Sequence, residues 1–335
     1  MSALNHSKSA LGHENGRPQV SFAIACYNAK PYLQAAVQSA LDQRDISCEV
    51  LIVDDGSSDG SLAEAEEMAR RDPRIRVFRT PRNSGPAGAR NIALEQMRGD
   101  WFAIHDSDDL IDPERARTMI DAANAAGADM VADNLRVFGT SIETHLMYEA
   151  TPDGEPHWLD LAAYLRNSAL FGKSPSPGFL KPMIRAETLN RLAIRYNEEL
   201  RIGEDDEFAL RLLNAGARYL LLPQAMYHYR KHEASISHRL SLDHVMRMMD
   251  AERRIRDIVG NEVAQTTAYR RRWIALQRAV AFTRSIEQLK QRRPIGALGT
   301  LIRNPGAIPL YTMPLKAVIG RAFRPTSRVA SRLCD

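Results

Sequence analysis

The arrangement of apolar runs in the first 130 residues most constrains what this chain can fold into. Runs rich in β-branched and aromatic residues lie at residues 20–25, 49–53, 75–78 and 101–105, and the segments between them repeat apolar residues at helical spacing. Strands that alternate with helices through short connections are typical of a parallel sheet with helices on both faces. We therefore predict an α/β fold with a mostly parallel central sheet.

Polar residues follow three of these strands at their carboxyl ends, where open α/β sheets bind ligands. Tyr27 follows the first strand, Asp55 follows the second, and Asp106 and Asp108 follow the fourth. Because the carboxyl ends of parallel strands meet at one edge of a sheet, we expect these side chains to line a common crevice.

The fourth strand ends most abruptly, because the carboxylates of Asp106, Asp108 and Asp109 directly follow an apolar run. Like charges crowded at a sheet edge repel one another unless a cation lies between them. A hard divalent cation, Mn²⁺ or Mg²⁺, bound by one or two carboxylates and by the phosphates of a ligand, would relieve this repulsion. Helix capping is the alternative. It accounts for Asp112 ahead of Pro113, but not for the acids further upstream.

The pattern is less regular after residue 130. We predict a strand at 179–184, confined to a sheet edge by Pro182, and closing strands at 219–222 and 227–229. Four consecutive acids, Glu204–Glu207, precede a predicted helix. Acids at a helix start complement the helix dipole, but four in a row exceed what capping requires. This run is therefore a second candidate for a functional site.

Other functional classes fit these motifs less well. The segment from Asp55 to Gly60, with Glu66 at the twelfth position, approaches a calcium-loop pattern, but a strand precedes it where a helix is needed. No G-x-G-x-x-G motif follows the first strand, which disfavours a dinucleotide-binding fold. A nucleotidyltransferase would be expected to have a glycine-rich, lysine-bearing phosphate loop there, and residues 26–29 do not form one.

Charge is distributed unevenly along the chain, whose formal net charge is +4. Residues 268–335 contain 14 Lys and Arg against two acids, whereas the preceding residues contain 31 against 39. The acidic part is typical of an enzyme body and the basic part of an attachment surface. Residues 1–19 lack the apolar core of a signal peptide and are predicted to form a flexible leader. Three cysteines without metal-site spacing indicate a reducing, cytoplasmic compartment.

Five short motifs, taken in order, make the sequence similar to a known family. They lie at residues 20–28, 53–59, 83–91, 106–109 and 203–205, and the similarity continues through residues 229–232 and 235–237. In these motifs the chain resembles the family 2 glycosyltransferases of the GT-A fold, and within them the bacterial exopolysaccharide transferases such as those that build succinoglycan. The resemblance implies a GT-A catalytic domain at 20–240, followed by a basic helical extension at 241–335.

The resemblance also assigns roles to the residues of the predicted crevice. Asp108 is implied to bind Mn²⁺ or Mg²⁺ directly, with Asp106 near the ribose or the metal, so that the cation stabilises a diphosphate leaving group. Tyr27 is implied to stack on the nucleobase and Asp55 to accept a hydrogen bond from a ring N–H. Arg90 is implied to lie in a loop that faces the nucleotide.

The second acidic run is implied to act on the acceptor. Asp205 matches the general base that deprotonates the acceptor hydroxyl, although Asp206 directly after it leaves this assignment open by one residue. Glu204, Arg230 and His232 are implied to contact the substrate.

Together these expectations describe an inverting, metal-dependent glycosyltransferase. It would move a hexose, with glucose as the best guess, from a UDP-sugar to a saccharide linked to polyprenyl diphosphate, in exopolysaccharide or other cell-surface polysaccharide synthesis. The alternative is a non-catalytic nucleotide-sugar-binding or scaffold protein of the same fold, which would have no use for a base at Asp205.

The location follows from the same features. We expect the protein in the cytoplasm, with its basic extension contacting anionic lipid at the inner face of the cytoplasmic membrane. The alternative for the extension is a solvated face that packs on the catalytic domain. No motif that reads nucleic acid accompanies the basic charge, so we expect no nucleic-acid partner.

Overall fold

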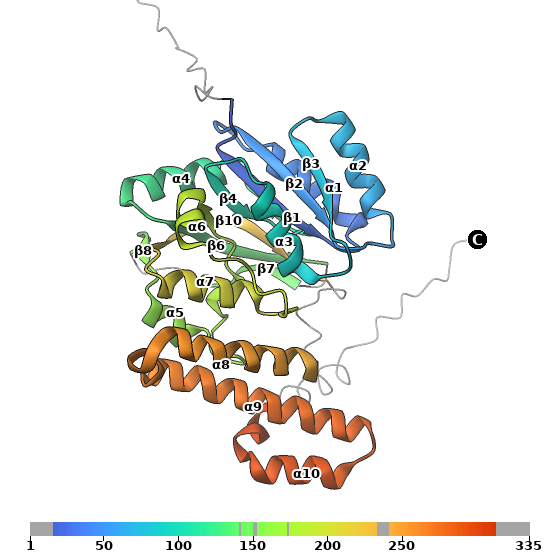
Figure 1. Ribbon diagram of the computed structural model, residues 1–335, viewed down its shortest axis with the longest axis vertical. Helices are drawn as coiled ribbons and strands as arrows, with labels where there is room; N and C mark the ends of the chain where they lie inside the picture. The colour runs from blue at the N-terminus through green and yellow to red at the C-terminus, as the bar shows by residue number, and fades with distance from the viewer. Residues whose placement is uncertain (1–15, 141, 150–152, 173, 233–240, 313–335) are drawn as a thin grey trace, which may run out of the picture.

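A single sheet organises the computed structural model of the protein, which describes residues 16–140, 142–149, 153–172, 174–232 and 241–312. The sheet has ten strands in the order β3-β2-β1-β4-β9-β6-β10-β5, with β7 paired to β6 and β8 paired to β10. Helices flank it on both sides (Figure 1). The predicted α/β fold is therefore confirmed.

The first half of the sheet is parallel, as the sequence predicts. It consists of β1 (Val20–Cys26), β2 (Cys48–Asp54), β3 (Ile75–Arg79) and β4 (Trp101–Ile104), connected by α1 (Lys30–Leu41), α2 (Ser61–Arg71) and α3 (Gly85–Gln96). Each strand begins and ends within one residue of its predicted bounds. Every residue of β2 and β4 is buried, which explains the apolar runs at 50–53 and 101–104 within these strands.

The second half of the sheet is mixed. Its elements are β5 (Leu110–Ile111), α4 (Arg115–Ala126), β6 (Met130–Gly139), β7 (Ile142–Leu146), β8 (His157–Trp158), α5 (Leu161–Asn167), η1 (Pro177–Phe179), β9 (Met183–Arg185), α6 (Ala186–Leu192), α7 (Glu204–Asn214) and β10 (Tyr219–Arg230). The strand β9 runs antiparallel between β4 and β6, whereas β10 is parallel to β6.

Three local predictions in this half are wrong. The strand near Pro182 is not at an edge: β9 begins after the proline, and the Pro182 carbonyl accepts from the Ile104 amide at 3.2 Å. The two closing strands are one strand, β10, with an irregularity between Leu222 and Tyr227. Asp112 does not cap α4, because its carboxylate lies 2.7 Å from Nε2 of His228 on β10.

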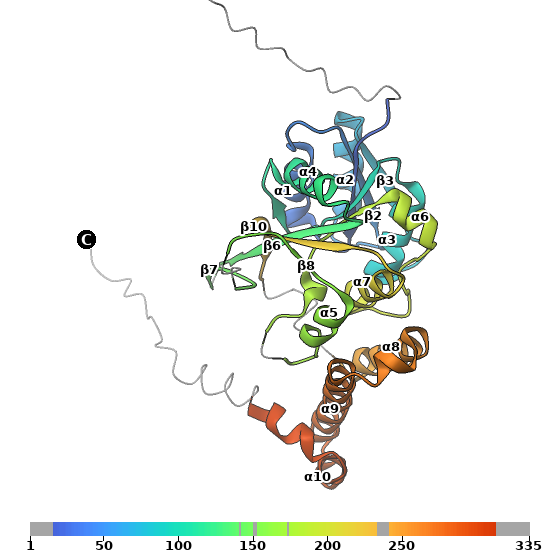
Figure 2. The same ribbon diagram turned by 90° about the vertical axis from the view of Figure 1, so that its left-hand side faces the viewer.

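Two layers of helices enclose the sheet, one on each face. Helices α1 and α4 lie on one face, and α3 and α7 lie on the other (Figure 2). The core between them contains fully buried side chains from strands and helices alike, among them Phe22, Leu33, Ile52 and Phe102. Because α7 begins with the second acidic run, this packing brings that run to the carboxyl ends of the parallel strands.

Beyond the sheet the described chain is helical, as predicted for the basic extension. It comprises α8 (Leu242–Ala264), α9 (Thr267–Lys290), α10 (Pro294–Arg303) and η3 (Pro305–Tyr311). Helix α8 contacts α7, α9 contacts α5, and α10 is the layer most distant from the sheet (Figure 1). None of the helices in the described ranges is long and apolar enough to cross a membrane.

The division into a leader at 1–19, a catalytic domain at 20–240 and an extension at 241–335 stays a prediction. Most of the leader and all residues after 312 lie outside the described ranges.

Candidate active site

A cavity of about 2150 Å³ opens at the carboxyl ends of β1, β2 and β4 and reaches residues of α7, α8 and α9. Eight of the predicted site residues line it: Tyr27, Asp55, Arg90, Asp106, Asp108, Glu204, Asp205 and His232. The structure thus brings the two acidic motifs, which are about a hundred residues apart in sequence, into one cavity.

Two buried cations join these motifs. Arg90 donates to Glu204 at 2.7 Å and to Asp205 at 2.9 Å through Nη1, and to Asp106 at 2.8 Å through Nη2. The Nζ of Lys181 lies 2.8 Å from Asp106 and 3.1 Å from Asp205. Arg90 is a residue of helix α3 and does not lie in a loop, contrary to the prediction. Its guanidinium is the centre of a cluster of buried charges.

The charges in this cluster stabilise one another. Burial alone would lower the pKa of Arg90 and of Lys181, but Asp106 and Asp205 raise both pKa values above their usual range. Burial would likewise raise the pKa of Asp106, but Lys181 and Arg90 hold it well below its usual range. For Glu204, burial and the neighbouring Asp205 prevail, and its pKa is raised. Three carboxylates and two cations leave the cluster with an excess of negative charge.

Asp108 has a different environment from Asp106. Its Oδ2 lies 2.7 Å from Nε2 of His232, and in the part of the chain that the structure describes no lysine or arginine pairs with its carboxylate. Burial and the charge of Asp106 raise the pKa of Asp108. Such a raised pKa is expected of an acid that is short of positive charge.

Residues of β10 form hydrogen bonds to the turn that carries Asp108. Arg230 donates to the Asp108 carbonyl at 2.6 Å through Nε, and its backbone N–H donates to the Asp109 carboxylate at 2.6 Å. The hydroxyl of Tyr227 donates to the same carboxylate at 2.9 Å. Arg230 does not line the cavity. A contact between Arg230 and the substrate stays a prediction. The structure shows its hydrogen bonds to the acidic turn.

The end of the cavity next to β1 and β2 has a buried residue, Asp55, and an exposed residue, Tyr27. The buried carboxylate of Asp55 accepts from the Thr80 hydroxyl at 2.8 Å and from the amides of Ser84 and Gly85 at 2.6 and 2.7 Å. Asp55 therefore holds the loop before α3 in place. Tyr27 is 48% exposed at the mouth of the cavity, which leaves its ring available for stacking.

The two neighbouring acids of α7 face different partners. Asp205 faces Arg90 and Lys181, whereas Asp206 lies 2.7 Å from Nη2 of Arg272 on α9 and accepts from the Tyr164 hydroxyl at 3.2 Å. Asp205 is therefore the acid directed toward Asp106, and Asp206 ties α7 to the helical extension.

Two of the side chains that build this site were missed at the level of sequence, Lys181 and Arg272. The sequence places Arg272 in the basic segment 268–335, which is predicted to be an attachment surface. Instead Arg272 is buried, where it donates to Glu252 at 2.9 Å and to the Ser168 carbonyl at 3.2 Å. Burial would lower its pKa, but Asp206 and Glu252 raise it well above the usual range.

Replacing Arg272 with methionine is expected to lower the free energy of unfolding by about 3–5 kcal/mol, because the buried Glu252 and the partly buried Asp206 lose their partner. Urea unfolding followed by circular dichroism measures the change. Arg271→Met is the matched control on the exposed side of the same helix and is expected to change stability by less than about 0.5 kcal/mol. Equal losses in the two variants would contradict the importance of the buried contact.

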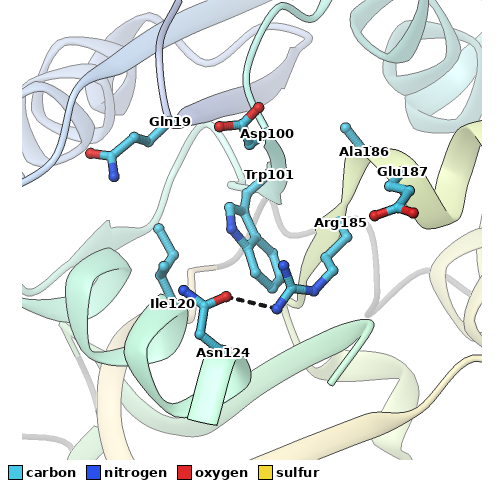
Figure 3. A pocket seen from close by; sticks show the side chains of 8 residues that line it. All are labelled: Gln19, Asp100, Trp101, Ile120, Asn124, Arg185, Ala186 and Glu187. Atoms are coloured by element: carbon cyan, nitrogen blue, oxygen red, sulfur yellow. Dashed lines mark hydrogen bonds between the residues drawn. The ribbon is translucent and has the colours of Figure 1, made fainter. Parts of the chain in front are cut away.

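A second, smaller cavity of about 340 Å³ lies near the amino ends of β1 and β4 (Figure 3). Its main cation, Arg185, is already engaged: it lies over the Trp101 ring and donates to Asn124 and to the Ala128 carbonyl, both at 2.7 Å. None of the predicted site residues lines this cavity. The large cavity is therefore the candidate active site.

Comparison with known proteins agrees with this fold. The model of the glycosyl transferase family 2 matches residues 21–189. The chain is 36% identical to the succinoglycan biosynthesis protein ExoO of Rhizobium meliloti (strain 1021), over 94% of this chain and 91% of that protein. It is 31% identical to ExoU of the same organism, over 93% and 91% of the two chains.

A solved structure shares the fold. Residues 1–349 of TarS from S. aureus, in complex with UDP-GlcNAc, superpose with a TM-score of 0.64 at 22% identity, covering 85% of this chain and 81% of that one. The family match, the two long alignments and the shared architecture lead to one conclusion: this chain belongs to glycosyltransferase family 2.

Proposed function

We propose that the protein is an inverting glycosyltransferase that moves a hexose, with glucose as the best candidate, from a UDP-sugar to a saccharide linked to polyprenyl diphosphate. The observation that supports this most directly is the single cavity lined by Asp106, Asp108 and Asp205. The names of ExoO and ExoU support a role in exopolysaccharide synthesis. The UDP-GlcNAc complex of TarS supports a UDP-sugar as donor.

The residues of the cavity suit a direct displacement. Asp205 accepts the proton of an acceptor hydroxyl, and the hydroxyl oxygen attacks the anomeric carbon on the side opposite the diphosphate. The bond from the anomeric carbon to the diphosphate oxygen breaks as the glycosidic bond forms, so the configuration inverts. Lys181 contacts both Asp205 and Asp106, and it thereby holds the base beside the acid of the donor site.

A divalent cation, Mn²⁺ or Mg²⁺, fits the donor set. Asp108 is the better protein ligand, because both oxygens of Asp106 already pair with Arg90 and Lys181. Among the described residues, no three His, Cys, Asp or Glu side chains form a metal site. Phosphates and water would supply the other ligands, as is common for Mg²⁺. When bound, the ion would neutralise charge that develops on the leaving diphosphate.

Calorimetric titration with UDP, with and without Mn²⁺, tests the donor site. Mn²⁺ is expected to strengthen UDP binding to the wild type, and Asp108→Ala is expected to remove that increase because the cation loses its protein ligand. Asp112→Ala is the control, since Asp112 is a nearby acid that does not line the cavity. If no nucleotide bound under any metal condition, the proposed transferase would give way to a scaffold role.

The proposed acceptor also implies a location. A saccharide attached to a polyprenyl lipid is presented at a membrane surface, so we place the protein in the cytoplasm, at the inner face of the cytoplasmic membrane.

A further inference from the structure

Helix α10 has an exposed apolar stripe, formed by Ile295, Leu298 and Ile302. These side chains are 85%, 59% and 69% exposed, and their i, i+3, i+7 spacing places them on one face of the helix. The opposite face contacts α9, where Ala297 is buried. Isolated exposed apolar residues are ordinary, but three that share one face of a helix indicate an interaction surface.

Exposed Lys and Arg side chains precede and follow this stripe in the sequence. Between residues 268 and 312 eight Lys and Arg side chains are exposed: Arg270, Arg271, Arg278, Arg284, Lys290, Arg292, Arg293 and Arg303. The same segment contains one acid, Glu287. In contrast to Arg247 and Arg253 on α8, which pair with Asp243 and Asp250, none of the eight forms an ion pair within the described ranges. The segment therefore has a strong, uncompensated positive charge.

We propose that α10 docks on an anionic phospholipid bilayer, with the apolar stripe in the acyl boundary and Arg292, Arg293 and Arg303 at the headgroups. An apolar face combined with basic residues is the composition of helices that lie in a membrane interface. Ten residues span only about 15 Å, so α10 lies along the surface and does not cross it.

The charge argues against a second copy of the chain as the occupant. A symmetric dimer through α10 would bring the same cations of both copies together, and like charges placed across an interface oppose association. An anionic bilayer has the complementary charge. The inference rests on the proposed function in one respect, since a lipid-linked acceptor is what makes bilayer contact useful to the enzyme.

Co-sedimentation of the full-length protein with vesicles tests the inference. Binding is expected to vesicles of phosphatidylcholine with phosphatidylglycerol, to weaken as salt is raised, and to be absent with phosphatidylcholine alone. Ile295→Gln/Leu298→Gln/Ile302→Gln is expected to lower the partition coefficient at least about tenfold, because each side chain loses its apolar burial. Arg292→Gln/Arg293→Gln is expected to lower it roughly fivefold for each charge.

Ile258→Gln is the matched control, because Ile258 is a 53% exposed isoleucine on α8, outside the stripe. It is expected to partition as the wild type does. Equal partitioning of the stripe variant and the wild type would overturn the inference. A wild type that binds no vesicles but dimerises through the stripe, as light scattering would show, would overturn it as well. UDP titration of the same samples tests the donor site separately, so a failure of the proposed function is distinguishable.

Discussion

Asp205→Asn is expected to lower turnover by about 10²- to 10⁴-fold, the usual contribution of a general base. The amide has nearly the shape of the carboxylate but cannot accept the proton of the acceptor hydroxyl. The proposed donor site consists of other residues of the cavity, so the affinity for UDP is expected to stay within a few-fold of the wild type. The measurement is release of UDP at saturating acceptor, combined with calorimetric titration of UDP.

Asp206→Asn decides between the two adjacent acids. Asp206 faces Arg272 and Tyr164, so its substitution is expected to affect stability more than turnover. If Asp206→Asn removed turnover and Asp205→Asn preserved it, the base would be assigned to the wrong residue. If neither variant lost turnover, neither Asp205 nor Asp206 would act as the base.

The sequence predicts the parallel half of the fold well, because its signals are local. The strands β1 to β4 are apolar runs bounded by turn residues, and buried parallel strands need no other information. The antiparallel insertion of β9 is not local. Its residues pair with β4 and β6, which are far away in sequence. Pro182 indicates an edge strand at the level of sequence, because the sequence does not show that the strand begins only after this proline.

The acidic residues of the site were also easier to predict than the basic residues that pair with them. Asp106 and Asp108 were indicated by the crowding of acids after a buried strand, and Asp205 by a run of four acids longer than capping requires together with the family resemblance. Lys181 gave no signal, because a lysine beside an apolar run is commonly exposed. Arg272 was missed for a related reason. One face of a helix is buried, and three consecutive arginines do not reveal which of them occupies that face.

Lys181→Met is expected to lower the free energy of unfolding strongly, as Arg272→Met is. Lys181 is buried and pairs with Asp106 and Asp205, and removal of one partner from a buried ion pair costs about 3–5 kcal/mol. Arg90 remains in contact with both acids, but two carboxylates and Glu204 then share one cation. Urea unfolding at neutral pH is the measurement, with Lys30→Met, an exposed lysine on α1, as the control.

The pH dependence of this loss distinguishes a charge effect from a packing effect. The native pKa of Asp106 is below its usual value, so its ionised form stabilises the fold above about pH 4, and this contribution is lost as the pH falls. The raised pKa of Lys181 contributes stability that is present below about pH 10 and lost above it. The difference between wild type and Lys181→Met is therefore expected to be greatest and nearly constant between these limits, and to shrink as the pH falls below about 4. A difference that stayed unchanged from about pH 7 to well below about pH 4 would mean that Lys181 stabilises the site by packing alone, and the ion cluster would not be what joins the proposed base to the proposed donor site.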